Sequence, residues 1–124
     1  MTDSRPTQAV AIVGGATAGA EVASRLADRG IQTVVFEQNA RPFGKIEDGL
    51  PRWHEALRRK EYETIRKKLS LPLVEFVPNT RIGEDIPFEE LVEDWNFSSV
   101  ILANGAWWDR PLPMEGAEAY INKG

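Results

Sequence analysis

Residues 9–26 read AVAIVGGATAGAEVASRL, and the expected architecture rests mainly on these residues. Its first five residues, Ala9 to Val13, form a continuous apolar run that ends at two glycines, which predicts a strand buried on both faces. Apolar residues then recur at helical spacing over 17–29, and Gly30 follows as a helix stop. A second apolar run, Thr33 to Phe36, completes a strand–helix–strand unit of about thirty residues.

The junction between the first strand and the helix is glycine-rich, GGATAG over 14–19. A dinucleotide-binding turn has glycine at the first, third and sixth positions, for the tight turn, the approach to the diphosphate and helix–strand packing. Gly14 and Gly19 match, whereas Ala16 holds the third position, where its methyl group predicts a shift of the loop or the diphosphate. Glu37, at the end of the second strand, can accept both hydroxyls of an adenosine ribose and disfavours a 2′-phosphate. The alternative is a structural turn and a surface glutamate.

The rest of the chain continues the alternation of strands and helices. The expected elements are a loop over 39–51, a helix over 52–69, a strand over 73–77, a short acidic helix over 88–95, a strand over 98–103 and an irregular tail from 109. In the helix over 52–69 we expect Trp53, Leu57, Ile65 and Leu69 to share one face. These connections imply a Rossmann-like α/β fold of three layers, in which helices flank a parallel sheet with the strand order 3-2-1-4.

Composition narrows the class of protein. The 124 residues suffice for one domain over 1–124, and the polar stretch 1–8 predicts a disordered tail with no secretory signal. The chain has no cysteine and one histidine, His54, which argues against disulfides and a metal site. No apolar run reaches about 18 residues, which argues against a membrane span. Without a secretory signal or a membrane span, we expect a cytoplasmic protein. The net charge of −4 argues against nucleic-acid binding.

Charge is unevenly distributed along the chain. Residues 52–69 carry seven basic and three acidic side chains, while residues 84–94 carry six acidic side chains and no basic one. Two solvated helix faces explain this pattern, and a docking patch for an acidic partner is the alternative.

Four motifs carry a family resemblance: AIVGGATAGAEVASRL over 11–26, EQNARPFGKIEDG over 37–49, VILANGA over 100–106 and PLPMEGAE over 111–118. Together they resemble the flavoproteins with two dinucleotide-binding domains, of the pyridine nucleotide-disulfide oxidoreductase fold. The most similar branch is adrenodoxin reductase with related ferredoxin–NADP reductases, and the glutamate synthase small subunit is a near relative.

The resemblance implies an FAD site. It would place the diphosphate against the glycine turn, the adenosine ribose at the end of the second strand, the adenine at the backbone near Arg81, and the flavin near the end of the fourth strand. The implied cofactor-binding residues are Gly14, Gly15, Ala16, Thr17, Ala18, Gly19, Glu37, Gln38, Gly44, Lys45, Ile46, Arg81, Asn104, Gly105 and Ala106.

The resemblance also implies an activity for a longer parent protein, which would pass electrons from NAD(P)H through FAD to an acceptor such as ferredoxin. Family members run several times longer, so we expect these residues to be a piece of such an oxidoreductase. His54 matches a histidine near the flavin, which implies proton handling or docking, against a surface histidine as the alternative. For Trp107 and Trp108 the alternatives are stacking on the cofactor and packing.

Two other functions stay open. An NAD-dependent dehydrogenase domain shares the glycine turn but does not explain the motifs over 37–49 and 100–106. A non-catalytic dinucleotide-binding or structural module would be compatible with Ala16 in the turn. A homodimer is also left open for the quaternary state.

Overall fold

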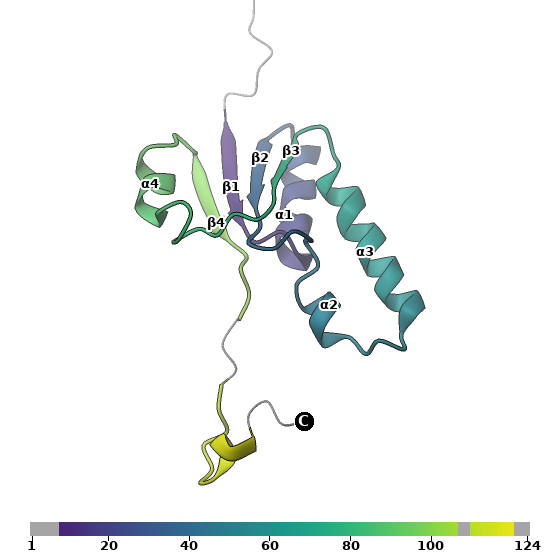
Figure 1. Cartoon of the computed structure of the whole chain (residues 1–124). Helices are drawn as coiled ribbons and strands as arrows, with labels where there is room; N and C mark the ends of the chain where they lie inside the picture. Colours follow the sequence, from purple (N-terminus) through teal and green to yellow (C-terminus); the bar gives the residue numbers. More distant parts are fainter. Residues whose placement is uncertain (1–7, 107–109, 121–124) are drawn as a thin grey trace, which may run out of the picture.

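The computed structural model describes residues 8–106 and 110–120. Four parallel strands form the sheet: β1 (Ala9–Val13), β2 (Gln32–Phe36), β3 (Val74–Val77) and β4 (Ser99–Leu102). Their order is β3-β2-β1-β4, which confirms the predicted order (Figure 1). In register, Ile12 of β1 lies between Val35 of β2 and Ile101 of β4. The central strand is therefore the one that leads into the glycine turn.

Helices cover both faces of this sheet. On one face, α1 (Thr17–Asp28) and α3 (Glu55–Leu69) join Ile12 and Val35 in the larger hydrophobic core. On the other face, α4 (Phe88–Glu93) places Leu91 against Ala11 and Phe36. Alternate β1 residues thus face opposite layers, as a strand buried on both sides requires, and the predicted three-layer α/β fold is confirmed (Figure 1).

One segment expected to be a loop contains a helix. Within 39–51 the chain forms α2 (Lys45–Gly49). Phe43, just before it, is 1% exposed and stacks on Tyr62 of α3 with ring centroids 4.1 Å apart. Its carbonyl accepts a hydrogen bond from the Ile46 amide, which begins the helical turn. The prediction from Pro and Gly content was wrong here because a buried aromatic anchor overrides local propensity.

The tail also departs from the prediction. The stretch from 110 was expected to be irregular, yet Ala117–Tyr120 form a 3-10 helix, labelled η1. The Ala119 amide donates to the Gly116 carbonyl, and the Ala117 amide donates to the Met114 carbonyl. These local bonds suffice for one short turn of this kind.

The prediction for the face of the helix over 52–69 was half right. Ile65 and Leu69 are buried, as expected. The helix begins at Glu55, however, and Trp53 before it is 78% exposed, while Leu57 is 44% exposed. Figure 1 shows the reason: the second half of α3 packs beside α1, whereas its first half extends past the sheet toward α2.

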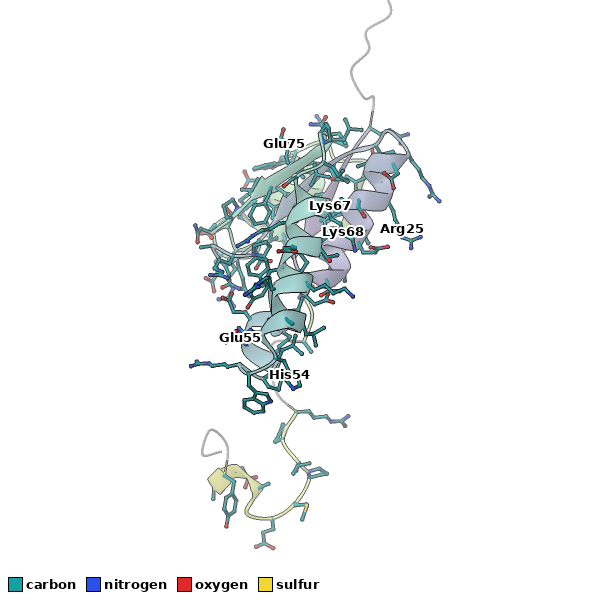
Figure 2. The ribbon with its side chains drawn as sticks, turned by 90° about the vertical axis from the view of Figure 1, so that its right-hand side faces the viewer. Arg25, His54, Glu55, Lys67, Lys68 and Glu75 are labelled. Carbon is teal, nitrogen blue, oxygen red and sulfur yellow. The ribbon has the colours of Figure 1, made fainter. Side chains whose placement is uncertain are left out.

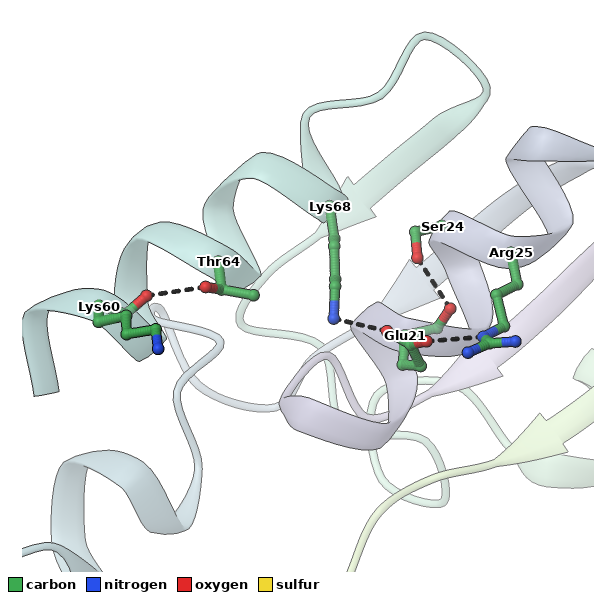
Figure 3. Close-up of polar contacts among 6 residues, drawn as sticks. All are labelled: Glu21, Ser24, Arg25, Lys60, Thr64 and Lys68. Atoms are coloured by element: carbon green, nitrogen blue, oxygen red, sulfur yellow. Dashed lines mark hydrogen bonds and ion pairs between the residues drawn. The ribbon is translucent and has the colours of Figure 1, made fainter. Parts of the chain in front are cut away.

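An ion pair connects the two helices of the larger core. The Lys68 ammonium of α3 lies 2.5 Å from one carboxylate oxygen of Glu21 in α1, and Arg25 binds the other oxygen at 2.6 Å (Figure 3). Hydrogen bonding to Lys68, and then to Arg25, lowers the pKa of Glu21 to about 2. The same pairing raises the pKa of Arg25. Glu21 therefore stays ionised far into the acid range.

Some predictions fall on parts of the chain that the structure does not describe. The tail predicted over 1–8 lies almost wholly outside the described residues, as do Trp107 and Trp108. Within residues 8–106 and 110–120, no helix is long and apolar enough to cross a membrane.

Candidate functional site

The glycine turn at the end of β1 brings three backbone segments into close contact. Gly14 has φ of 104°, and a Cβ atom on it would lie 2.4 Å from the carbonyl oxygen of Ala103, which follows β4. A Cβ atom on Gly19 would lie 1.8 Å from the Gly14 carbonyl oxygen. Neither position has room for a side chain. Gly14 is required for the tight turn, and Gly19 is required for the close packing of α1 against that turn.

The N-terminus of α1 opens into this turn without a side-chain cap. Ala16 is the N-cap residue, no side chain caps the helix, and its first turn holds no acidic residue. The amide N–H groups at the start of a helix have no partner within the helix, and the helix dipole adds partial positive charge there. An uncapped helix start beside a glycine turn suits an anion such as a diphosphate.

The methyl group of Ala16 is accommodated by Gly44. Residue 44 has φ of 49°, and a Cβ atom there would lie 2.9 Å from the Ala16 Cβ. The loop after β2 therefore has room for the methyl group only because residue 44 is glycine. Ala16 replaces the glycine expected at the third position of the dinucleotide-binding turn, and Gly44 on the facing loop leaves room for its methyl group.

Glu37 organises the turn from the end of β2. Its side chain is 4% exposed, and one carboxylate oxygen accepts a hydrogen bond from the Gly15 amide at 2.8 Å. The other oxygen accepts from the Asn39 amide at 3.2 Å. That second oxygen also accepts from the Asn39 side-chain amide at 3.4 Å, so the oxygen that binds the Gly15 amide is the one that retains capacity for a ligand hydroxyl.

Two cavities meet above this turn, at the carboxyl edge of the sheet. The first, which we call the Glu37 cavity, has a volume of about 670 Å³ and extends past Glu37 and Gln38 to Thr80, Arg81 and Phe88. The second, the Ile46 cavity, has a volume of about 550 Å³ and extends past Lys45 and Ile46 to α3. Six residues line both cavities: Ala16, Gly44, Ala103, Asn104, Gly105 and Ala106.

The predicted binding residues gather here with few exceptions. Thirteen of the fifteen line one cavity or both; Gly15 and Gly19 instead support the turn from behind. The prediction did not include several other lining residues. In the Glu37 cavity these are Val13, Phe36, Thr80, Ile82, Phe88, Leu102 and Ala103, and in the Ile46 cavity they are Leu50, Leu57, Glu61 and Ala103. The i, i+4 spacing of Leu57 and Glu61 puts both on one helix face, but only the packing of α3 places that face beside the cavity.

His54 lies apart from these residues. It precedes α3, and it lines neither cavity. Figure 2 shows it with Glu55 at the end of α3 remote from Glu75 on the sheet. Its catalytic role stays a prediction. In the described part of the chain, no group of three or more histidine or acidic residues is arranged to hold a metal ion.

The described residues therefore fit a dinucleotide: a parallel sheet, a glycine turn that opens a helix and a buried acid after the second strand define a dinucleotide-binding α/β domain. In sequence and in fold, the chain is similar to parts of FAD- and NAD(P)-binding oxidoreductases, which agrees with the family resemblance. No protein-family model matches the chain.

Comparison with known proteins supports this assignment. The chain is 37% identical over 115 residues to the NADPH glutamate synthase small chain of Bacillus subtilis, and 33% identical over 111 residues to that of Mycobacterium tuberculosis. In fold it is similar to Mycobacterium tuberculosis FprA in complex with NADPH, with a TM-score of 0.78 and 27% identity.

The relatives are much longer than this chain. The matches cover 93% and 90% of the chain but only 22% of each glutamate synthase subunit. The match to FprA covers 90% of the chain and 25% of that protein. The chain thus corresponds to about a quarter or less of each relative.

Proposed function

We propose that this chain is the FAD-binding part of an NAD(P)H-dependent flavoprotein oxidoreductase. The observation that carries the proposal is the pair of cavities that share a wall at the glycine turn. A dinucleotide has two bulky ends joined by a diphosphate, and the two cavities meet beside the uncapped start of α1. The adenosine end suits the Glu37 cavity, because an acid after the second strand recognises a ribose.

The chain's own residues would hold each part of FAD. The first amide groups of α1 would donate hydrogen bonds to the diphosphate, and Glu37 would accept the ribose hydroxyls. The backbone beside Arg81 would contact the adenine. The apolar side chains of Ile46, Leu50 and Leu57 would exclude water from the ring end. Bound FAD would supply the hydride and electron chemistry of the reaction.

The remainder of the activity belongs to the whole protein. Its relatives are named for NADPH, which supports NADPH or NADH as the electron source. From the four sequence motifs we extend the proposal to a ferredoxin-like electron acceptor. From the polar N-terminal stretch and the lack of a long apolar run we extend it to a cytoplasmic location. Reduction of ferredoxin by the full-length protein with NADPH tests the acceptor, and cell fractionation tests the location.

Equilibrium titration of the chain with FAD and with NAD tests the core of the proposal. We expect FAD to bind, with a change in flavin absorbance and fluorescence, and to bind more tightly than NAD. Tighter binding of NAD would favour the dehydrogenase alternative. Binding of neither dinucleotide would favour the structural module.

A pair of variants locates the site. Glu37→Gln keeps the acceptor for the Gly15 amide but removes the charge, so we expect FAD to bind about tenfold more weakly or worse. Glu75→Gln is the matched control, because Glu75 is exposed on β3 and lines neither cavity. Equal affinity in the two variants would exclude Glu37 from the binding site.

A further inference from the structure

Glu61 lies on α3 four residues after Leu57, and both residues line the Ile46 cavity. Residues four apart share one face of a helix, so this face of α3 forms a wall of the cavity. Most of the lining is apolar, with Ile46, Leu50 and several alanines. Glu61 is the only carboxylate among the described residues that line it.

The carboxylate of Glu61 has no partner in the described part of the chain. Glu61 is partly buried, yet it takes part in no hydrogen bond or ion pair there. Glu47 of α2 is paired by contrast, since its carboxylate lies 3.3 Å from Arg41. A carboxylate that lines a cavity without a protein partner keeps its acceptor oxygens available to a bound ligand.

We propose that Glu61 faces the ring end of bound FAD and lowers its reduction potential. This inference rests on the proposed function and identifies a residue that tunes the cofactor. A carboxylate oxygen accepts hydrogen bonds from N–H donors, which the polar edge of a flavin ring offers. Its negative charge beside the ring opposes the addition of electrons, because charge near the ring tunes the electronics of a flavin.

The neighbouring Glu63 provides a matched control. It lies two residues further along α3 and lines a separate groove with Arg59 and Arg66 on another face of the helix. Its charge is the same and its place in the sequence is close, but it does not line the Ile46 cavity.

The experiment compares the FAD-loaded wild-type chain with Glu61→Gln, Glu61→Asp, Glu61→Lys and Glu63→Gln. The midpoint potential of the bound flavin is measured by reductive titration with dithionite against a reference dye. We expect a more positive potential in E61Q, a larger positive shift in E61K, and wild-type potentials in E61D and E63Q. The flavin absorbance maximum should shift in E61Q and E61K alone.

Two results would overturn the inference while leaving FAD binding intact. One is a wild-type potential in both E61Q and E61K. The other is an equal shift in E61Q and E63Q, which would reflect the net charge of the helix. If the wild-type chain takes up no FAD, the proposed function fails first, and the inference fails with it.

Discussion

Gly19 is the residue at which the turn allows the least freedom. It sits inside α1, where alanine normally stabilises a helix by up to about 1 kcal/mol relative to glycine. A Cβ atom at this position would nevertheless lie 1.8 Å from the Gly14 carbonyl oxygen, which is backbone. A methyl group at position 19 would fit only if α1 moved away from the glycine turn after β1. The contact between α1 and this turn supports the candidate site from behind.

We predict that Gly19→Ala destabilises the chain by about 1–3 kcal/mol, the usual cost of overpacking, and weakens FAD binding. Urea denaturation and FAD titration measure the two effects. Gly49→Ala is the control: Gly49 is also helical, and the nearest neighbour of its added Cβ would be 3.7 Å away. We expect Gly49→Ala to be neutral or stabilising. Equal stability of the two variants would contradict the close contact between α1 and the turn.

At the scale of the elements, the ion pair of Glu21 and Lys68 connects α1 to α3 (Figure 3). The pKa of Glu21 falls from 4.5 to about 2 on folding. A carboxyl group with a lowered pKa stabilises the folded state above its unfolded pKa, and this contribution is lost as the pH falls through the folded value. The pair therefore contributes fully only well above pH 4.5, and most of its contribution is lost as the pH falls from 4.5 to about 2.

We predict that Glu21→Gln lowers the urea midpoint at neutral pH, and that the difference from wild type shrinks steadily between pH 4.5 and 2. Denaturation series at several pH values measure this convergence. Glu84→Gln serves as the comparison, since the pair of Glu84 with Arg81 is well exposed and joins neighbours in sequence. Exposed pairs of this kind contribute little. A constant gap between wild type and Glu21→Gln across the acid range would contradict the prediction.

The elements also show what the sequence could and could not predict. The four strands and α1 follow from short apolar runs and glycine positions, which are local signals. The strand order follows from the doubly wound arrangement that helical connections between parallel strands favour. The helix α2 and the exposure of Leu57 depend on tertiary contacts, namely the stacking of Phe43 on Tyr62 and the extension of α3 past the sheet. Glu61 was missed for the same reason: its place in the cavity depends on where α3 packs.

For the whole molecule, ligand binding and folding are linked. A ligand that binds only the folded chain stabilises it by about 2.7 kcal/mol at a free concentration one hundred times its Kd. For a chain of 124 residues this corresponds to a rise in Tm of about 10 °C. We expect this rise in Tm only for a ligand that occupies both the Glu37 cavity and the Ile46 cavity and contacts the glycine turn between them.

We predict such a rise in Tm with FAD, measured by circular dichroism during heating. Riboflavin lacks the diphosphate and the adenosine, so it should bind more weakly and raise Tm less at the same concentration. NAD, which shares the adenosine end and the diphosphate, should fall between them. A rise with riboflavin equal to that with FAD would show that the glycine turn and the Glu37 cavity take no part in binding.

The pairing of β1 with β4 has a consequence for biosynthesis. Val10 of β1 lies beside Ser99 of β4, 89 residues later in the chain (99 − 10). A ribosome that adds about 5–20 residues per second needs roughly 4–18 s to deliver the partner strand. Until then one edge of the central strand has unpaired amide and carbonyl groups, and a free strand edge invites pairing with other chains. The nascent chain is thus most vulnerable to aggregation between the synthesis of β1 and that of β4, after the glycine turn has formed and before the sheet is complete.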